Sequence, residues 1–146
     1  MSWVVEFHQD FEPEVDALPE EVQNKLLAYT KVLEAFGFEL GRPHVDTLKG
    51  SRHSNMKELR FKAADGVWRV AFAFDPKRNA ILLVAGDKSG SSESRFYKQL
   101  IKTADDRFDA HLAQLNTQQE VKVRITDGEN FKGKTRTVIT RTTQKD

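Results

Sequence analysis

The chain has 146 residues, of which 38% are hydrophobic and 31% are charged, and its formal net charge is +1. These values are typical of a single globular domain and not of a disordered chain. The chain holds no cysteine, which excludes disulfides and thiolate chemistry. No apolar run approaches the roughly 18 residues of a membrane span, and the N-terminus lacks a signal-peptide pattern. We therefore expect a cytoplasmic protein that does not enter membranes.

Charge is unevenly distributed along the chain. The first 48 residues hold ten acidic and three basic side chains, whereas residues 49–104 hold five acidic and twelve basic ones. This segregation favours a basic surface formed by the middle of the chain, available to a polyanion. A mixed, fully solvated surface explains the same counts. The distribution alone leaves both interpretations open.

The N-terminal part predicts one strand followed by two helices. WVVEF, residues 3–7, alternates as a strand does, and residues 10–18 allow a short helical turn. A longer helix begins at Pro19, has Glu20 and Glu21 in its first turn, and ends at Gly37. Apolar residues recur in it at helical spacing and predict a core-facing stripe: Val22, Leu26, Tyr29, Val32, Leu33 and Phe36.

The middle of the chain predicts three strands and a further helix. After the polar loop 41–54, ELRF runs to about Lys62, VWRVAFAF follows a turn signal at Asp65-Gly66, and AILLVAG follows a break at 76–79. A second polar loop spans 86–94, and an amphipathic helix is expected from there to about residue 115. Its apolar side is formed by Phe96, Leu100, Ile101, Ala104, Phe108 and Leu112.

The last segment, residues 116–146, is rich in Thr, Lys and Arg. VKVRI, residues 121–125, and TVIT, residues 137–140, can pair as a hairpin around Asp127-Gly128. A mobile tail is the alternative, because a two-stranded ribbon that packs on nothing is marginal in water.

Alternation along the two central strands places two arginines on one face of the sheet. Successive side chains of a strand point to opposite faces, so Leu59 takes one face and Arg60 the other. The large apolar side chains of the next strand, from Trp68 to Phe74, must share the face of Leu59 to be buried with it. Arg69 therefore shares the face of Arg60. With a two-residue turn at 65–66, Lys62 would lie opposite Arg69, and Arg60 would be a diagonal neighbour about 7–8 Å away.

The face that holds the two arginines is expected to be shallow, because Ala71 and Ala73 also lie on it. Something bulky could then rest there. A pair of guanidinium groups suits a phosphate, since each offers paired donors and a permanent charge. An ordinary solvent-facing sheet surface is the alternative. Spacing alone does not decide between the two.

The order of these elements carries a resemblance to a known family. LKGS, MKELRF, VWRVAFAFD and AILLVAGDKSG lead into a helix that contains RFYKQLIKTADDRFDAHL. Over residues 1–115 this resembles the RelE/HigB-like toxins of type II toxin–antitoxin systems, in particular their phage-derived branch. The resemblance implies an α+β, RelE-like fold: a small antiparallel sheet packed against an N-terminal helical pair and a C-terminal helix. Residues 116–146 depart from the family pattern and would be an extension, whose role stays open among contact with RNA or the ribosome, stabilisation of a dimer, and none.

The resemblance also implies an activity and partners. Such toxins are mostly ribosome-dependent endoribonucleases (mRNA interferases) that need no metal or other cofactor and arrest growth by inhibiting translation. The ribose 2′-hydroxyl attacks the adjacent phosphate, leaving a 2′,3′-cyclic phosphate and a free 5′-hydroxyl. The implied partners are the ribosome, mRNA and a helix-turn-helix antitoxin, with a heterotetramer as one arrangement. Two alternatives remain: a toxin of the same fold that inhibits DNA gyrase without catalysis, and an inactive binding module.

Site residues follow from the resemblance one position at a time. Arg60 and Arg69 would hold the scissile phosphate and stabilise the transition state, and Lys88 would neutralise the leaving 5′-oxygen or bind the backbone. Tyr97 and Lys98, in the terminal helix, complete the catalytic set. RNA-binding positions are expected at Lys49, Arg52, His53, Lys57 and Lys62. The general base stays open among His53, Tyr97 and a lysine whose pKa is lowered by neighbouring cations.

Overall fold

A computed structural model gives the fold of residues 3–127, with side chains described for residues 3–117. The chain divides into two compact units, Met1–Phe108 and Asp109–Asp146, and the first contains the sheet, the two N-terminal helices and residues 93–108 of the terminal helix. The sheet and its separate helices confirm the predicted α+β class. The elements are β1 (Val4–Phe7), α1 (Glu12–Asp16), α2 (Glu20–Phe36), the 3-10 helix η1 (Gly37–Glu39), β2 (Val45–Thr47), β3 (Met56–Ala63), β4 (Gly66–Phe74), β5 (Asn79–Asp87) and α3 (Glu93–Asp127).

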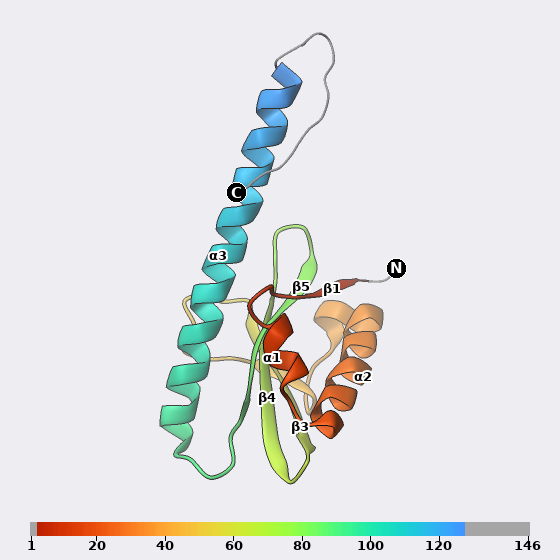
Figure 1. Cartoon of the computed structure of the whole chain (residues 1–146), viewed down its shortest axis with the longest axis vertical. Helices are drawn as coiled ribbons and strands as arrows, with labels where there is room; N and C mark the ends of the chain where they lie inside the picture. Colours follow the sequence, from red (N-terminus) through yellow and green to blue (C-terminus); the bar gives the residue numbers. More distant parts are fainter. Residues whose placement is uncertain (1–2, 128–146) are drawn as a thin grey trace. The chain divides into compact units, whose positions relative to one another are not determined.

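The sheet has five strands in the order β1-β5-β4-β3-β2 (Figure 1). Strands β2 to β5 pair antiparallel, as predicted, but β1 pairs parallel to β5, so the sheet is mixed. Because α1, α2 and three strands separate β1 from β5, no hairpin dictates the direction of that pair. The three-residue β2, which pairs with the start of β3, lies in the segment predicted as a loop. It is too short to show the alternation that identifies a strand.

Helices cover both faces of the sheet. On one face α1 and α2 enclose an apolar core that includes Leu59, Val70 and Phe72. On the other face Ala71 and Ala73 are fully buried together with Leu100, Ala104 and Phe108 of α3, which Figure 1 shows on the opposite side from α1 and α2. Something bulky does lie on the two alanines, as expected, but it is helix α3, so this part of the face is not left for a ligand. Their small side chains let the first half of α3 pack there.

Helix α2 begins at Glu20, one residue after its predicted start, because Pro19 is the N-cap; it ends at Phe36, with the predicted Gly37 at its C-cap. Val22, Leu26 and Leu33 of the predicted stripe are fully buried, but Phe36 is 52% exposed. The chain turns away from the helix at Gly37, where φ is +53°, and the Trp3 ring lies against that glycine. Trp3 therefore closes the core at this end of the helix, where Phe36 was expected to do so.

The turn between β3 and β4 differs from its prediction by one residue. Ala63 pairs with Gly66, so the turn residues are Ala64 and Asp65, which both have positive φ (50° and 61°). Gly66 is required for a different reason. A Cβ at this position would lie 2.7 Å from both a carboxylate oxygen of Asp87 and the indole nitrogen of Trp68, so these side chains would have to shift. The glycine is needed because neighbouring side chains approach its Cα closely, whereas the turn itself is formed by the two residues before it.

Helix α3 continues beyond residue 115 to Asp127. VKVRI, residues 121–125, is therefore helical and not the first strand of a hairpin, whereas TVIT lies outside the described residues. Extending an existing helix adds a hydrogen bond for each residue fixed, while a new two-stranded ribbon needs a surface to pack on. Within residues 3–127, none of the helices has the length and apolar composition needed to cross a membrane.

Gly37 offers a test of this core. A Cβ on Gly37 would overlap the indole of Trp3, whereas one on Gly90, where φ is also positive (+81°), meets nothing within 4 Å. Both substitutions to alanine carry backbone strain, but only Gly37→Ala adds a steric clash in the core. We expect Gly37→Ala to lower the free energy of unfolding by roughly 1–3 kcal/mol more than Gly90→Ala, measured by chemical denaturation. Equal losses in the two variants would contradict the packing of Trp3 on Gly37.

Candidate active site

Arg60 and Arg69 lie directly opposite each other on β3 and β4. The prediction that they share a face is confirmed, but Lys62 pairs with Val67 and not with Arg69. The backbone N–H of Arg60 donates to the carbonyl of His44 on the other side of β3. The arginine pair is therefore a non-hydrogen-bonded pair, in which the two Cα atoms approach to about 4.5 Å. Two side chains with permanent positive charges therefore leave the backbone at neighbouring positions of the sheet.

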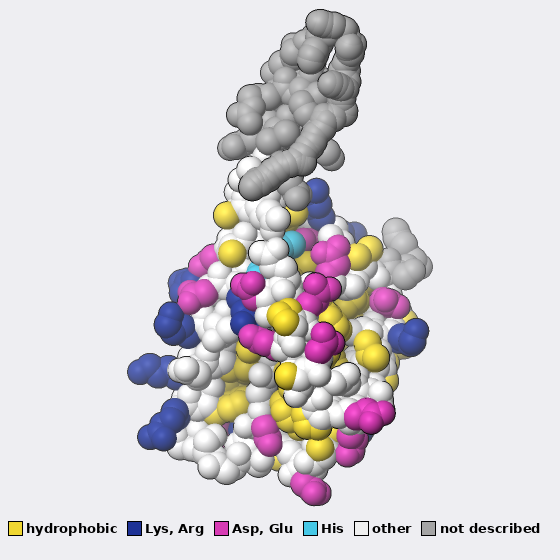
Figure 2. Space-filling model, in the orientation of Figure 1, with side chains coloured by type: hydrophobic (Ala, Val, Ile, Leu, Met, Phe, Trp, Pro, Cys, Tyr) yellow, Lys and Arg dark blue, Asp and Glu magenta, His cyan; other side chains and the backbone are white. Residues whose placement is uncertain are grey.

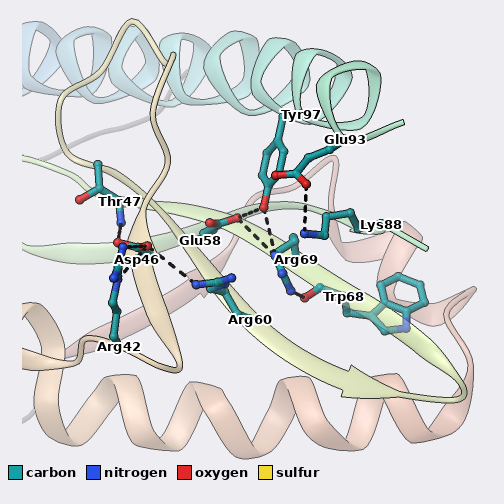
Figure 3. Close-up of polar contacts among 10 residues, drawn as sticks. All are labelled: Arg42, Asp46, Thr47, Glu58, Arg60, Trp68, Arg69, Lys88, Glu93 and Tyr97. Atoms are coloured by element: carbon teal, nitrogen blue, oxygen red, sulfur yellow. Dashed lines mark hydrogen bonds and ion pairs between the residues drawn. The ribbon is translucent and has the colours of Figure 1, made fainter. Parts of the chain in front are cut away.

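The two guanidinium groups turn to different carboxylates (Figure 3). Arg69 is only 6% exposed; its Nε lies 3.7 Å from Glu58 and donates to the Tyr97 hydroxyl at 3.1 Å, while Nη1 donates to a backbone carbonyl. The Arg60 side chain is 35% exposed, and its Nη1 lies 3.8 Å from Asp46. Arg69 is thus a buried, fixed group, whereas Arg60 remains accessible to an anion.

Tyr97 connects the helix to the charges on the sheet. Its hydroxyl donates to Glu58 at 2.9 Å and accepts from Arg69. Burial raises the pKa of the Glu58 carboxyl, and the Tyr97 hydrogen bond and the Arg69 charge oppose that rise. Burial also raises the pKa of the Tyr97 phenol, with Arg69 opposing and Glu58 adding to the rise. Tyr97 therefore remains protonated at neutral pH, so it can accept a further proton only while it passes its own proton to Glu58.

Glu58 is the member of this group that the sequence predictions omitted. It is 6% exposed and lies two residues before Arg60 on the same face of β3. The alternation that paired the two arginines also puts this carboxylate beside them. The signal was present in ELRF, but a glutamate among exposed lysines and arginines is usually solvated. In the folded chain Tyr97 packs over the strand and, together with Arg69, covers this carboxylate.

Further cations surround this buried network. Lys88, just after β5, lies 3.9 Å from Glu93, and its Nζ is 5.9 Å from the centre of the Tyr97 ring. Lys98 is exposed on α3, and Lys62 is exposed on β3, on the face of Arg60. Lys57 has the opposite parity and lies on the face of Leu59, so the structure does not bring it to this group.

The predicted loop residues form a second cluster, around Asp105 of α3. This carboxylate is 2% exposed and accepts hydrogen bonds from the Ser51 hydroxyl and the backbone N–H of Arg52. The ring of His53 meets the edge of Phe108 at 4.9 Å. Phe108 follows Tyr97 by eleven residues, a separation of roughly 16 Å along a helix. His53 therefore lies far from the arginines, and its candidacy as their general base finds no support; Lys49 is exposed in the same loop.

The arrangement combines accessible positive charge with a buried carboxylate–phenol–guanidinium network. Figure 2 shows acidic side chains spread over the face with α1 and α2, while Lys and Arg side chains gather along one edge of the same view. Such a site can bind a polyanion and transfer a proton. Within the described residues, no group of three or more His, Asp or Glu side chains is placed to hold a metal ion.

The network makes a prediction about the ionisation of Tyr97. The chain has two tyrosines, so the change Tyr29→Phe leaves Tyr97 as the single phenol in an ultraviolet pH titration. In that background Glu58→Gln should lower the pKa of Tyr97, because a negative charge that disfavours phenolate is lost. Arg69→Gln should raise it for the converse reason.

Asp46→Asn is the matched control, since Asp46 contacts Arg42 and Arg60 but not Tyr97. It should leave the titration of Tyr97 unchanged. A shift in this control as large as in Glu58→Gln would mean that the ionisation of Tyr97 reports only on net charge.

Comparison with solved structures places the chain near two RelE toxins. A double arginine-to-alanine mutant of Escherichia coli toxin RelE in the free state matches with a TM-score of 0.48 and 13% identity, over 70% of this chain and 97% of that chain. A chain of an archaeal RelE–RelB complex from Pyrococcus horikoshii OT3 matches with a TM-score of 0.45 and 20% identity, over 62% of this chain and 100% of that one.

Sequence comparison gives closer relatives. Two proteins of Mycobacterium tuberculosis that carry toxin names are similar: HigB2, 46% identical over 68% of this chain, and HigB3, 43% identical over 66% of it. The aligned part is 50% of HigB2 and 82% of HigB3, so the chain spans about half the length of the first relative. The family model described as phage derived protein Gp49-like matches residues 13–109, which include β3, β4, β5 and the first half of α3. The chain belongs to the Gp49-like family of phage-derived proteins, which confirms the resemblance seen in its strands and terminal helix.

Proposed function

We propose that this chain is the toxin of a type II toxin–antitoxin system and that it cleaves messenger RNA on the ribosome. The observation that carries the proposal is the buried Glu58–Tyr97–Arg69 network beside the accessible cations Arg60 and Lys88. The names of the two mycobacterial relatives support the toxin role. The reaction is cleavage by the 2′-hydroxyl, which needs charge stabilisation and proton transfer and can proceed without a metal.

Arg60 and Lys88 hold the scissile phosphate, because they are the members of the predicted catalytic set with both exposure and a site-facing position. Lys62 and Lys98 contact neighbouring phosphates, and Lys49 and Arg52 extend this contact along the loop. Arg69 has its donors committed to Tyr97, a carbonyl and Glu58. It acts as a positioning residue that fixes the phenol and supplies positive charge near the reaction. This replaces the direct phosphate contact expected for Arg69.

Proton transfer runs through Tyr97. The phenol oxygen accepts from Arg69 and donates to Glu58, which leaves one lone pair for the ribose 2′-hydroxyl. As the 2′-oxygen forms its bond to phosphorus, its proton passes to Tyr97 and the phenol proton passes to Glu58. The bond from phosphorus to the 5′-oxygen breaks, and Lys88 protonates that oxygen. The raised pKa of Glu58 suits it to receive the proton.

A tightly bound antitoxin keeps such an enzyme silent until it is needed. We propose that the partner is a small DNA-binding protein of the helix-turn-helix kind, as the resemblance implies. The acidic surface of the first 48 residues would repel RNA and ribosomes. That surface therefore turns away from the ribosome, while the edge with the basic side chains faces it.

Induced expression should arrest growth, and primer extension should map new 5′ ends within translated messages. Arg60→Gln and Lys88→Gln should each reduce cleavage by about 10²–10³-fold, because each removes charge stabilisation at the phosphate. The control is Lys31→Gln on α2, an exposed lysine that lies outside the site. Arg69→Ala is a poor test, since it leaves Glu58 buried without its partner and lowers stability.

Two other outcomes would contradict parts of the proposed function. Cuts that persist on naked RNA with the same pattern would remove the ribosome from the mechanism. Gyrase-dependent DNA breaks with intact messages would replace RNA cleavage by the non-catalytic alternative.

The proton relay has its own test in a double-mutant cycle. Tyr97→Phe and Glu58→Gln should each slow cleavage by about 10²–10⁴-fold, and the double variant should be no slower than the worse single one, because both act in one step. Tyr29→Phe serves as the control, since this ring stacks on Phe61, which lies on the opposite face of β3 from Arg60. Additive losses would contradict a shared relay.

A further inference from the structure

Three charged side chains meet beside the candidate site, and two of them, Arg42 and Asp46, have no part in the proposed reaction. Asp46 on β2 pairs directly with Glu58 on β3, so its side chain lies on the sheet face that carries the site. Its Oδ2 lies 3.0 Å from Nη2 of Arg42 and 3.8 Å from Nη1 of Arg60. One carboxylate oxygen is thus shared by two guanidinium groups, as Figure 3 shows.

Asp46 is bound more firmly to its own strand and to Arg42 than to Arg60. Nε of Arg42 donates to the same Oδ2 at 3.1 Å, and the backbone N–H of Thr47 donates to Oδ1 at 2.8 Å. The separation of 3.8 Å between Asp46 and Arg60 exceeds the length of a hydrogen bond. An anion can therefore bind the Arg60 guanidinium without breaking a hydrogen bond to Asp46.

This cluster is open to solvent. The Arg42 side chain is 75% exposed, and the side chains of Arg60 and Asp46 are 35% and 26% exposed. The hydrogen bond from Arg42 holds the pKa of the Asp46 carboxyl below its ordinary value, so this group is charged at neutral pH. The carboxylate therefore cancels one of the two positive charges that the arginines would otherwise present to a ligand.

We propose that Arg42 and Arg60 together bind the phosphate backbone of RNA, and that Asp46 competes with the phosphate and so limits the affinity. The Asp46 oxygen lies between two guanidinium groups, which is where an oxygen of a bound phosphate would lie. Each guanidinium offers paired donors that match a phosphodiester. The inference rests on the proposed function, which puts RNA at Arg60. It adds Arg42 as a residue that binds RNA and Asp46 as one that weakens binding.

A role for Asp46 in positioning Arg60 fits the contacts less well. A positioned arginine is fixed by hydrogen bonds, as Arg69 is by those it donates to Tyr97 and to a backbone carbonyl. The contact of Arg60 with Asp46 is longer than such a bond. The backbone N–H of Arg60 donates to the carbonyl of His44, so β2 is held against β3 without the Asp46 side chain.

The first test uses the full chain and messenger RNA on ribosomes, and it separates the half-saturating concentration from the maximal rate of cleavage. Asp46→Asn keeps the shape of the side chain and an acceptor but removes its charge. It should lower the half-saturating concentration about 3–5-fold in low salt and leave the maximal rate within about twofold, because competition affects binding alone. The matched control is Asp16→Asn, at an exposed residue that ends α1 on the other side of the sheet, and it should change neither quantity.

Arg42→Gln tests the other half of the proposal. It should raise the half-saturating concentration about 3–5-fold, with the maximal rate unchanged, whereas Lys31→Gln, on exposed α2, should have no effect. A second assay measures binding of the chain alone to a fluorescent 2′-O-methyl oligoribonucleotide, which lacks the attacking hydroxyl. There Asp46→Asn should tighten binding, and Arg42→Gln should reduce the slope of log affinity against log salt by about 0.7, the value for one lost phosphate contact.

The outcomes separate this inference from the proposed function. A half-saturating concentration that Asp46→Asn raises or leaves unchanged would overturn the inference, and so would Arg42→Gln without effect in both assays. A fall in the maximal rate with unchanged affinity would assign Asp46 to positioning Arg60 and would overturn it too. A wild-type chain that cleaves no RNA but binds the oligonucleotide, with both substitutions acting as expected, would refute the proposed function and support the phosphate site. A chain that neither cleaves nor binds RNA would overturn both.

Discussion

The site depends on how one small area of sheet holds two arginines at directly opposed positions. Two side chains of the same charge, whose Cα atoms are about 4.5 Å apart, repel each other. Water cannot screen this repulsion at Arg69, because its side chain is buried. The chain resolves the conflict by giving each arginine its own carboxylate, Glu58 for Arg69 and Asp46 for Arg60. The two ion pairs orient the guanidinium groups in different directions. One charge becomes structural and the other stays available to a ligand.

Helix α3 links this electrostatic arrangement to the core. Leu100, Ala104 and Phe108 bury the same face of the sheet that carries the charges, and Tyr97 lies one turn earlier on the same side of the helix. A helical residue three or four positions away shares a face, so the packing that seals the core also sets the position of the phenol. Asp105 adds to this by holding the loop at Ser51 against the helix. Core and candidate site are therefore not separable parts of this unit.

The sequence was sufficient for features that follow from local rules. Strand alternation placed Arg60 and Arg69 on one face, and Pro19 and Gly37 bounded α2 correctly. It was insufficient where the outcome depends on what packs against an element. The amphipathic pattern of α3 identified its apolar side but not the sheet face it covers, so Ala71 and Ala73 suggested a hollow. The burial of Glu58 is likewise a property of the Tyr97 contact and has no signature in ELRF alone.

Small residues on the sheet explain why Tyr97 can reach its partners. Ala71 and Ala73 are fully buried beneath α3, and a Cβ on Gly86 would lie 2.8 Å from the Phe96 ring. Larger side chains at these positions would lift the helix from the sheet. A hydroxyl that now donates to Glu58 at 2.9 Å would lose that contact with a displacement of about 1 Å, since hydrogen bonds weaken steeply beyond their normal length. In the sequence, the small side chains of Ala71 and Ala73 suggested room for a ligand. In the structure, they let the helix approach closely enough to complete the candidate site.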